Sequence, residues 1–76
     1  MNILFKGIKY RTENGDPFDR GSADSYYCRG IDPHYWPDGT YKGDRTEHWD
    51  MSEEQIAEYF AGYKYNEEQG DFKDWG

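Results

Sequence analysis

The sequence contains few of the aliphatic side chains from which a small domain usually builds its core. They are Ile3, Leu4, Ile8, Ile31 and Ile56, with Met1 and Met51. Aromatic residues supply the rest, with eight Tyr, four Phe and three Trp, and each such ring can bury about 150–250 Å². A disordered chain would be poor in aromatics, and 76 residues are close to the lower size at which a chain folds without covalent staples. The composition therefore predicts one small folded domain over residues 1–76.

Cysteine is nearly absent as well, since Cys28 is the only one. An internal disulfide is thus excluded, and a reducing, cytoplasmic setting is the natural inference. No signal peptide and no apolar run of membrane-spanning length can be recognised. We expect a soluble cytoplasmic protein with no membrane partner, in which Cys28 is a small half-buried side chain without a redox role.

The patterns that mark metal sites and enzymes are also missing. Zinc sites usually contain two close ligand pairs, whereas Cys28, His34 and His48 are separated by six and fourteen residues. The stretch DGTYKGD lacks the alternating oxygen ligands of a calcium loop. There is no glycine-rich phosphate loop and no nucleophile motif, and a domain this small rarely forms the cleft that paired carboxylates need. The sequence therefore predicts a protein without metal, cofactor or enzymatic activity.

Positive charge is scarce in the second half of the chain. Residues 1–43 carry six acidic and six basic side chains, whereas residues 44–76 carry ten acidic side chains against Arg45, Lys64 and Lys73. The whole formal net charge of −7 therefore arises in the second half. Because affinity for nucleic acid comes largely from Lys and Arg, we do not expect this half to bind nucleic acid directly. Such asymmetry instead indicates a partner with a basic surface.

The N-terminal stretch NILFKGIKYRT predicts a short β-element. Apolar Ile3 and Phe5 precede Lys6-Gly7, and Ile8 and Tyr10 follow it. This alternation is typical of one bent strand or of a hairpin that turns at Lys6-Gly7. A two-stranded ribbon is marginal in water, so either form must pack on something else.

The stretch DRGSADSYYCRG predicts a short helix after that element. Asp16-Pro17 is expected to form a turn or break before it. Asp19 or Ser22 can cap the helix, which we place at about 20–29. Gly30 lies where a left-handed residue usually ends a helix.

A longer helix is predicted at about 53–68. Ser52 and Gln55 form a capping box at its start, and Gly70 ends it. Its apolar residues recur at the period of an α-helix and are expected to pack on Tyr26 and Tyr27 of the first helix. They are Ile56, Tyr59, Phe60 and Tyr63.

Gly62 predicts where the two helices approach each other. A glycine inside a helix costs about 1 kcal/mol relative to alanine, so a close contact must offset that cost. The small residues of the first helix, Gly21 and Ala23, are the expected partners. Together these elements predict an α+β domain, with an N-terminal strand or hairpin packed against two helices.

The segment between the helices predicts a long aromatic loop of about twenty residues. Pro33 and Pro37 exclude a long helix or strand there, and loops of this length are usually functional or flexible. Tyr35, Trp36 and Tyr41 are its candidate binding residues. Their rings could stack on nucleobases, form a protein hot spot, or simply fold over the helices to complete the core.

The predicted layout resembles that of the ribosome modulation factors, in which a loop joins two short helices. The residues that carry this resemblance lie within 20–66 and are Arg20-Gly21, Ala23, Arg29-Gly30, Pro33-His34 and Ala61-Gly62-Tyr63. The resemblance implies a helix–loop–helix scaffold and binding to ribosomal RNA. Members of that family are basic, whereas the second half of this chain is acidic. The stretches GSADSYY, DPHYW and GDFKDW also resemble small phage-encoded proteins.

Two functions remain open from the sequence. The first is a small non-enzymatic binding protein, encoded by a phage, whose acidic residues engage a basic surface of a host protein and stand in for phosphates as an inhibitor. The candidate acidic residues are Glu54, Glu58, Glu67, Glu68, Asp71 and Asp74. The alternative is a ribosome- or RNA-associated factor that works through Lys6, Lys9, Arg11, Arg20 and Arg29.

Overall fold

The N-terminal residues form a tight β-hairpin, which is one of the two predicted alternatives. The computed structural model describes residues 2–70 and 72–73. Strand β1 (Asn2–Phe5) pairs antiparallel with β2 (Ile8–Arg11). The turn residues Lys6 and Gly7 have positive φ angles of 51° and 81°, which is the backbone that two-residue hairpins favour.

The hairpin is attached to the helices through aromatic side chains. The Phe5 ring meets Tyr65 edge-on with 5.5 Å between ring centroids. The Tyr10 ring lies 4.9 Å from that of Phe18. Because Phe18 and Tyr65 belong to different helices, the hairpin packs against both of them.

The first helix is confirmed, but it lies earlier than the sequence predicts. Helix α1 spans Pro17–Tyr26, not residues 20–29. Asp16 is the residue before its first turn and Pro17 is its first residue. The fixed φ of proline suits this position, so Asp16-Pro17 starts the helix and does not break the chain before it. Asp19, a predicted cap, instead lies in the first turn and accepts a hydrogen bond from the Gly15 N–H at 3.0 Å.

The end of α1 also differs from the prediction. Cys28, and not Gly30, is the left-handed residue that stops the helix, with a φ of 57°. The Cys28 N–H bonds the Ser25 carbonyl at 3.1 Å and the Arg29 N–H bonds the Asp24 carbonyl at 2.9 Å. These two hydrogen bonds form a Schellman motif. They bring Arg29 back toward the helix and leave Cys28 exposed, rather than half-buried.

The loop between the helices is long, as predicted, but it contains a minimal strand pair. Strand β3 (His34–Tyr35) pairs antiparallel with β4 (Thr46–Glu47). A single 3₁₀ turn, His48–Asp50, follows β4. The two prolines are compatible with this arrangement because they lie on either side of β3 and not within it.

The second helix is confirmed almost to the residue. Helix α2 spans Glu53–Gln69. The predicted capping box is present, with the Gln55 N–H bonding the Ser52 hydroxyl at 3.1 Å and the Ser52 N–H bonding the Gln55 side chain at 2.9 Å. Gly70 ends the helix with a φ of 67°.

The two helices cross at a pair of glycines. A Cβ atom added to Gly21 would collide with the Tyr59 carbonyl, and one added to Gly62 would collide with the Phe18 carbonyl. The predicted close contact of Gly62 with the first helix is therefore confirmed, although its nearest neighbour there is the Phe18 backbone and not a small residue. The backbones are so close that only hydrogen atoms fit between them at this point.

The core of α2 follows the predicted stripe in part: Tyr59 is buried and Ile56 and Tyr63 are half-buried as members of it, but Phe60 is not. Among the described residues, Tyr59 and Phe18 are almost fully buried, at 0% and 1% exposure. Phe60, which the predicted stripe places inside, is 43% exposed, and Tyr27 is 38% exposed. The buried line of α2 is Tyr59, Gly62 and Asn66. The hydrophobic period misses Gly62 and Asn66 because glycine and asparagine do not register as apolar.

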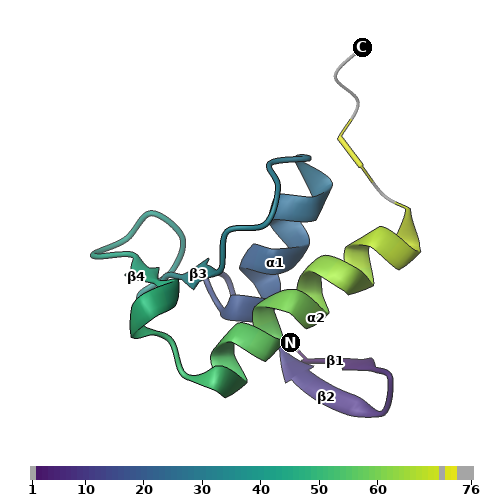
Figure 1. Cartoon of the computed structure of the whole chain (residues 1–76), viewed down its shortest axis with the longest axis horizontal. Coiled ribbons are helices and arrows are strands. Elements are labelled where there is room, and N and C mark those ends of the chain that lie inside the picture. The colour runs from purple at the N-terminus through teal and green to yellow at the C-terminus, as the bar shows by residue number, and fades with distance from the viewer. Residues whose placement is uncertain (1, 71, 74–76) are drawn as a thin grey trace.

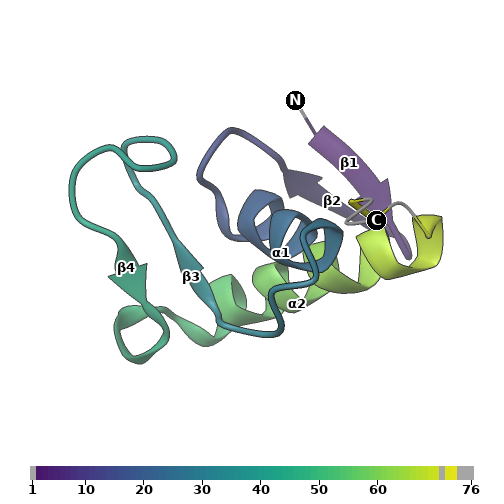
Figure 2. The ribbon, with the colours of Figure 1, turned by 90° about the horizontal axis from the view of Figure 1, so that it is seen from above.

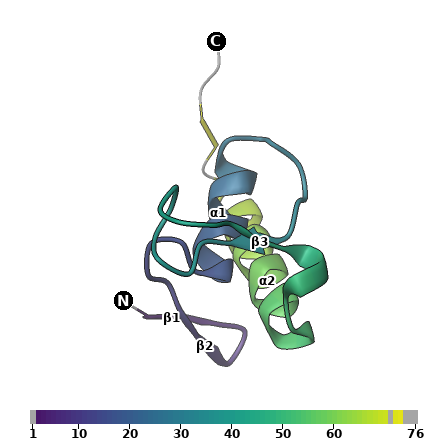
Figure 3. The ribbon, with the colours of Figure 1, turned by 90° about the vertical axis from the view of Figure 1, so that its left-hand side faces the viewer.

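The elements surround the helix crossing. Figure 1 shows α1 crossing α2 near the middle of the molecule, with the β1–β2 hairpin and the β3–β4 ribbon on opposite sides. The view from above in Figure 2 keeps the two ribbons apart on either side of the helices. In Figure 3 the β3–β4 ribbon lies in front of the crossing helices. The fold is thus an α+β domain, in which the loop ribbon lies next to α1.

Candidate functional site

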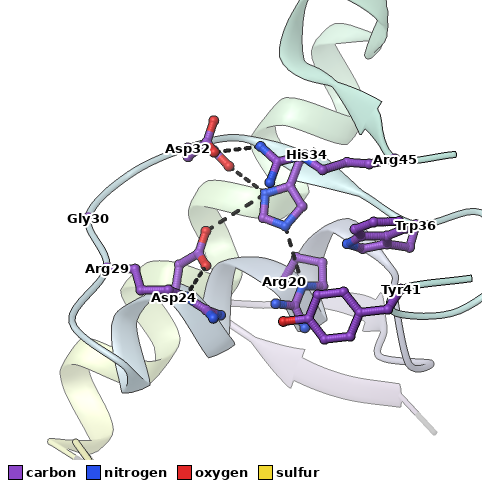
Figure 4. Close-up of a pocket in the computed structure, with 9 residues that line it drawn as sticks. All are labelled: Arg20, Asp24, Arg29, Gly30, Asp32, His34, Trp36, Tyr41 and Arg45. Carbon is purple, nitrogen blue, oxygen red and sulfur yellow. Dashed lines mark hydrogen bonds and ion pairs between the residues drawn. The ribbon is translucent and has the colours of Figure 1, made fainter.

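A pocket, which we call the main pocket, lies where α1 faces β3 and the loop that follows it. Its volume is about 380 Å³. Figure 4 shows the side chains around it, which come from α1, from the segment after it and from the loop. They are Arg20, Asp24, Arg29, Gly30, Asp32, His34, Trp36, Tyr41 and Arg45. Three arginines therefore gather in one place in a chain of net charge −7.

A buried carboxylate anchors the pocket to α2. Asp24 is 4% exposed and accepts a hydrogen bond from the Tyr59 hydroxyl at 2.5 Å. The same hydroxyl accepts from the Asp32 N–H at 3.0 Å. Burial raises the pKa of Tyr59, and its hydrogen bond to Asp24 raises it further. Tyr59 therefore keeps its proton and links α2 to both α1 and the loop.

His34 connects the loop backbone to Arg20. Its Nδ1 lies 2.6 Å from the Asp32 carbonyl oxygen, so Nδ1 must carry the proton. Its Nε2 receives a hydrogen bond from the Arg20 Nε at 3.4 Å, and a guanidinium can only donate. Nε2 must therefore offer its lone pair. The ring is 3% exposed and fixes the position of Arg20.

Two of the three arginines are engaged by carboxylates. The Arg29 Nε donates to Asp24 at 3.1 Å. The Arg45 Nη2 donates to Asp32 at 2.5 Å and to Glu47 at 3.0 Å. The Arg45 Nε also lies 2.9 Å from Glu47, although its N–H is not aimed at an acceptor. Burial lowers the pKa of Arg45, but the hydrogen bonds to the two carboxylates outweigh it, and the net direction is upward.

The structure divides the three predicted aromatic residues of the loop. Trp36 and Tyr41 both border the pocket and meet edge-on, with 5.5 Å between ring centroids. Tyr35 lies beside a different, smaller pocket, where its hydroxyl accepts a hydrogen bond from the Gln55 side chain at 3.3 Å. Trp36 and Tyr41 thus belong together as a candidate binding pair, whereas Tyr35 connects the loop to α2.

The predicted acidic residues form a second candidate site on α2. Glu54, Glu67 and Glu68 are exposed and Glu58 is half-buried. Glu68 pairs with Lys6 of the hairpin turn at 3.2 Å. Asp71 and Asp74, which were predicted with them, lie outside the described residues. We call Glu54, Glu58, Glu67 and Glu68 the α2 carboxylate surface.

Carboxylates of this surface lie close enough to repel one another. Burial raises the pKa of Glu58, and the negative charges of Glu54 and Asp16 raise it further, while Arg11 lowers it. Glu54 and Glu58 are four residues apart on one helix, a spacing at which like charges destabilise the helix. The carboxylates thus disfavour one another, and a cation would relieve that repulsion.

The basic residues of the RNA-binding alternative do not form one surface. Arg11 pairs with Asp16 at 3.0 Å, and Lys6 pairs with Glu68. Arg20 is 8% exposed, and Arg29 donates to Asp24. Lys9 lies on β2 at the edge of another pocket, beside Glu54 and Glu58. Most of these cations are therefore already used within the fold.

Several residues that form the main pocket are not recognisable as such from the sequence patterns. Asp24 received no role, although it is the carboxylate on which Tyr59, Arg29 and the neighbouring His34 converge. The hydrogen bonds of the Tyr59 hydroxyl are not predicted, because the hydrophobic period places its ring in an apolar stripe. The spacing of Arg20 and Asp24, four residues apart, was the available signal that α1 turns a charged face inward.

Within residues 2–70 and 72–73 the structure contains neither a metal-binding cluster nor a membrane-spanning helix. No three side chains of His, Cys, Asp or Glu in this part of the chain are grouped so that they could hold a metal ion. Neither described helix has the length and hydrophobicity to span a bilayer.

Comparison with known proteins adds no relative. No family model, curated protein or solved structure matches this chain. The resemblances to the ribosome modulation factors and to phage-encoded proteins therefore stay predictions. Of the residues that carry the first resemblance, Gly21 and Gly62 are the two at which the helices cross.

Proposed function

We propose that this chain is a small cytoplasmic binding protein without enzymatic activity. Its α2 carboxylate surface would engage a basic surface of another protein. The observation that supports this proposal most directly is the crowding of Glu54 and Glu58, since burial raises the pKa of Glu58 and the negative charge of Glu54 raises it further. Like charges at this spacing cost a helix about 0.2–0.5 kcal/mol per pair. A cationic partner would turn that cost into a favourable interaction.

The charge balance of α2 supports the same proposal. The helix carries five glutamates against one lysine, Lys64. Of the five, only Glu68 is in an ion pair among the described residues, and its partner Lys6 is 61% exposed. Complementary charge mainly accelerates association and selects partners. A surface of this kind therefore suits rapid capture of a positively charged target.

The nature of the target follows from the same chemistry. A row of carboxylates on a helix can occupy the positions at which a nucleic-acid-binding protein holds phosphates. On the resemblance to phage-encoded proteins, the target would be a host protein that normally holds nucleic acid, and binding would inhibit it. The RNA-binding alternative is less well supported, because its arginines are paired with carboxylates or buried.

Affinity capture tests this proposal. The wild-type chain is compared with Glu54→Gln/Glu58→Gln/Glu67→Gln, which removes three charges from α2 and leaves the Lys6–Glu68 pair intact. The charge-matched control is Asp38→Asn/Asp44→Asn/Asp50→Asn, three exposed positions outside α2. We expect a basic bacterial protein to be retained by the wild type and the control, and lost with the α2 variant. Equal retention by all three would contradict the proposal, and equal loss from both variants would reduce it to an effect of net charge.

A further inference from the structure

Arg20 is the one arginine of the main pocket without a close carboxylate partner among the described residues. Its Nε donates to the His34 ring, and its Nη1 lies 3.4 Å from the Thr40 hydroxyl. The nearest carboxylate in an ion pair with it is Asp19, at 3.9 Å. Arg29 and Arg45, by contrast, each donate directly to a carboxylate. A cation that is only 8% exposed is costly unless an anion pairs with it, and an anion closer than the Asp19 carboxylate would lower that cost further.

The pocket presents two aromatic rings beside this arginine. Figure 4 shows Trp36 and Tyr41 together beside Arg20, with the Asp24–Arg29 pair on the opposite side of the pocket and the Asp32–Arg45 pair along its upper edge. A guanidinium matches the two oxygens of a phosphate or carboxylate. The face of an aromatic ring stacks on another flat ring. The pocket therefore combines a site for an anionic group with a site for a planar group.

The backbone of Tyr41 supports a binding role for its ring. Tyr41 has a φ of 65°, a conformation that is strained for a bulky side chain. The ring is nonetheless 74% exposed, so the fold gains little buried surface in return for the strain. Such strained residues concentrate at ligand-binding positions, where the structure around them holds the side chain ready.

We propose that this pocket binds a small molecule in which a flat ring carries a phosphate or carboxylate group. The anionic group pairs with Arg20, and the ring stacks against Trp36 and Tyr41. A volume of about 380 Å³ lies within the range of small-molecule pockets, about 300–1,000 Å³. The ligand differs in kind from the basic protein expected at α2, and the two sites can be tested separately.

Titration of the isotope-labelled chain by NMR tests the proposal with defined probes. Adenosine 5′-monophosphate and 4-hydroxyphenylacetate each join a ring to an anionic group, one a phosphate and the other a carboxylate. Inorganic phosphate and acetate lack the ring, and adenosine lacks the anion. We expect at least one ring-bearing anion to shift the amide signals of residues 29–45 and to bind at least about tenfold tighter than every incomplete probe. Selective binding of one of them identifies the preferred combination of ring and anionic group.

Substitution at the pocket separates the ring contact from non-specific binding. Tyr41→Ala should weaken binding of the ring-bearing anion by about tenfold or more, as loss of one stacking partner typically does, and its exposure makes unfolding an unexpected outcome. Trp49→Ala, which removes an aromatic ring of 70% exposure outside the pocket, should leave binding unchanged. Arg20→Lys, which keeps the charge but loses the two-pronged geometry, should also weaken it.

Three results would overturn the proposal. The first is that neither ring-bearing anion saturates the pocket signals at dissociation constants near ~1 mM or below. The second is that inorganic phosphate or acetate binds as tightly as the ring-bearing probe. The third is that Tyr41→Ala and Trp49→Ala, with native spectra, bind the probe equally well.

Discussion

At the scale of single residues, polar atoms occupy an unusual share of the interior. Among the described residues, five polar or charged residues are buried, namely Arg20, Asp24, Ser25, His34 and Asn66. The large hydrophobic side chains buried with them are Phe18, Met51 and Tyr59. These polar groups have partners, such as the Asn66 amide that donates to the Ser25 hydroxyl across the helix crossing at 3.1 Å. Because a buried group that loses its partner costs more than an average hydrogen bond contributes, each of them positions its neighbours strongly.

The hydroxyl of Tyr59 provides the first test. Tyr59→Phe keeps the ring but leaves Asp24 and the Asp32 N–H without a shared partner. We expect a loss of about 1–3 kcal/mol in the free energy of unfolding, measured by urea denaturation at neutral pH. A loss below about 0.5 kcal/mol, the usual range of surface substitutions, would show that the hydroxyl does not connect the helices.

The same substitution should change stability at alkaline pH. Burial and the hydrogen bond to Asp24 raise the pKa of Tyr59 above its ordinary value of 10.0. Above that pH an unfolded tyrosine ionises while Tyr59 stays protonated, so the free energy of unfolding falls as the pH rises. Burial and Glu67 also raise the pKa of Tyr63, so part of the fall remains in Tyr59→Phe. The variant should show the shallower decline above pH 10, and identical slopes would refute the assignment.

The location of the core gives a second residue-scale prediction. Phe18 is 1% exposed and Phe60 is 43% exposed. Phe18→Ala should cost about 3–5 kcal/mol and unfold most of so small a domain. Phe60→Ala should cost about 1 kcal/mol or less, because much of its ring already contacts water. The two variants are compared by thermal denaturation, and the reverse order of stability would restore the stripe predicted from the sequence.

At the scale of elements, contacts between backbones determine how the helices pack. The α1–α2 crossing depends on Gly21 and Gly62, at each of which a side chain would strike a carbonyl of the other helix. The end of α1 depends on Cys28, which adopts a backbone conformation that glycine normally supplies. Both features can be tested with single substitutions. We expect a change of Gly62 to lower the free energy of unfolding and a change of Cys28 to raise it.

Gly62→Ala is the sharper of these substitutions. In an exposed helix the change would stabilise the protein by about 1 kcal/mol. At this crossing the added methyl group must push the helices apart, and overpacking of this kind costs about 1–3 kcal/mol or more. We therefore expect a lower denaturation midpoint. A higher midpoint would mean that the helices are not in backbone contact.

Substitution of Cys28 by glycine should change stability in the opposite direction. A side chain in the left-handed region costs about 1–2 kcal/mol. Glycine avoids this cost, but it loses more conformational entropy on folding, which offsets part of the gain. Cys28→Gly should therefore raise the free energy of unfolding by about 0.5–1 kcal/mol, whereas Cys28→Ser should leave it unchanged. A destabilised Cys28→Gly variant would show that the thiol makes contacts that its exposure does not suggest.

The elements also show what could be predicted from the sequence. The hairpin turn, the capping box of Ser52 and the end of α2 at Gly70 depend on neighbouring residues, so local patterns were sufficient. Hydrophobicity predicted the burial of Tyr59 but not the rest of the inward line of α2, because Gly62 and Asn66 are buried for reasons of backbone contact and hydrogen bonding. The main pocket combines residues distant in the sequence, such as Arg20 and Tyr41, and only the fold brings them together.

At the scale of the whole molecule, charge is sorted into two regions of opposite character. The α2 carboxylate surface leaves Glu54, Glu58 and Glu67 outside any ion pair among the described residues. The main pocket gathers three arginines beside two aspartates. A net charge far from zero promotes solubility but disfavours compaction through self-repulsion. We attribute the surplus of acidic groups on α2 to partner binding, which is the central claim of the proposed function.

The rate of association with the captured basic protein, followed by stopped-flow fluorescence over a range of ionic strengths, tests this claim most directly. Electrostatic steering accelerates association about 10–10³-fold, and the acceleration falls steeply with salt. We predict that Glu54→Gln/Glu58→Gln/Glu67→Gln associates at least about tenfold more slowly than the wild type at low salt, with a flatter salt dependence and no loss of thermal stability. The Asp38→Asn/Asp44→Asn/Asp50→Asn control should keep most of the wild-type rate. If the α2 variant associates as fast as the wild type at low ionic strength, the α2 carboxylate surface is not the binding site.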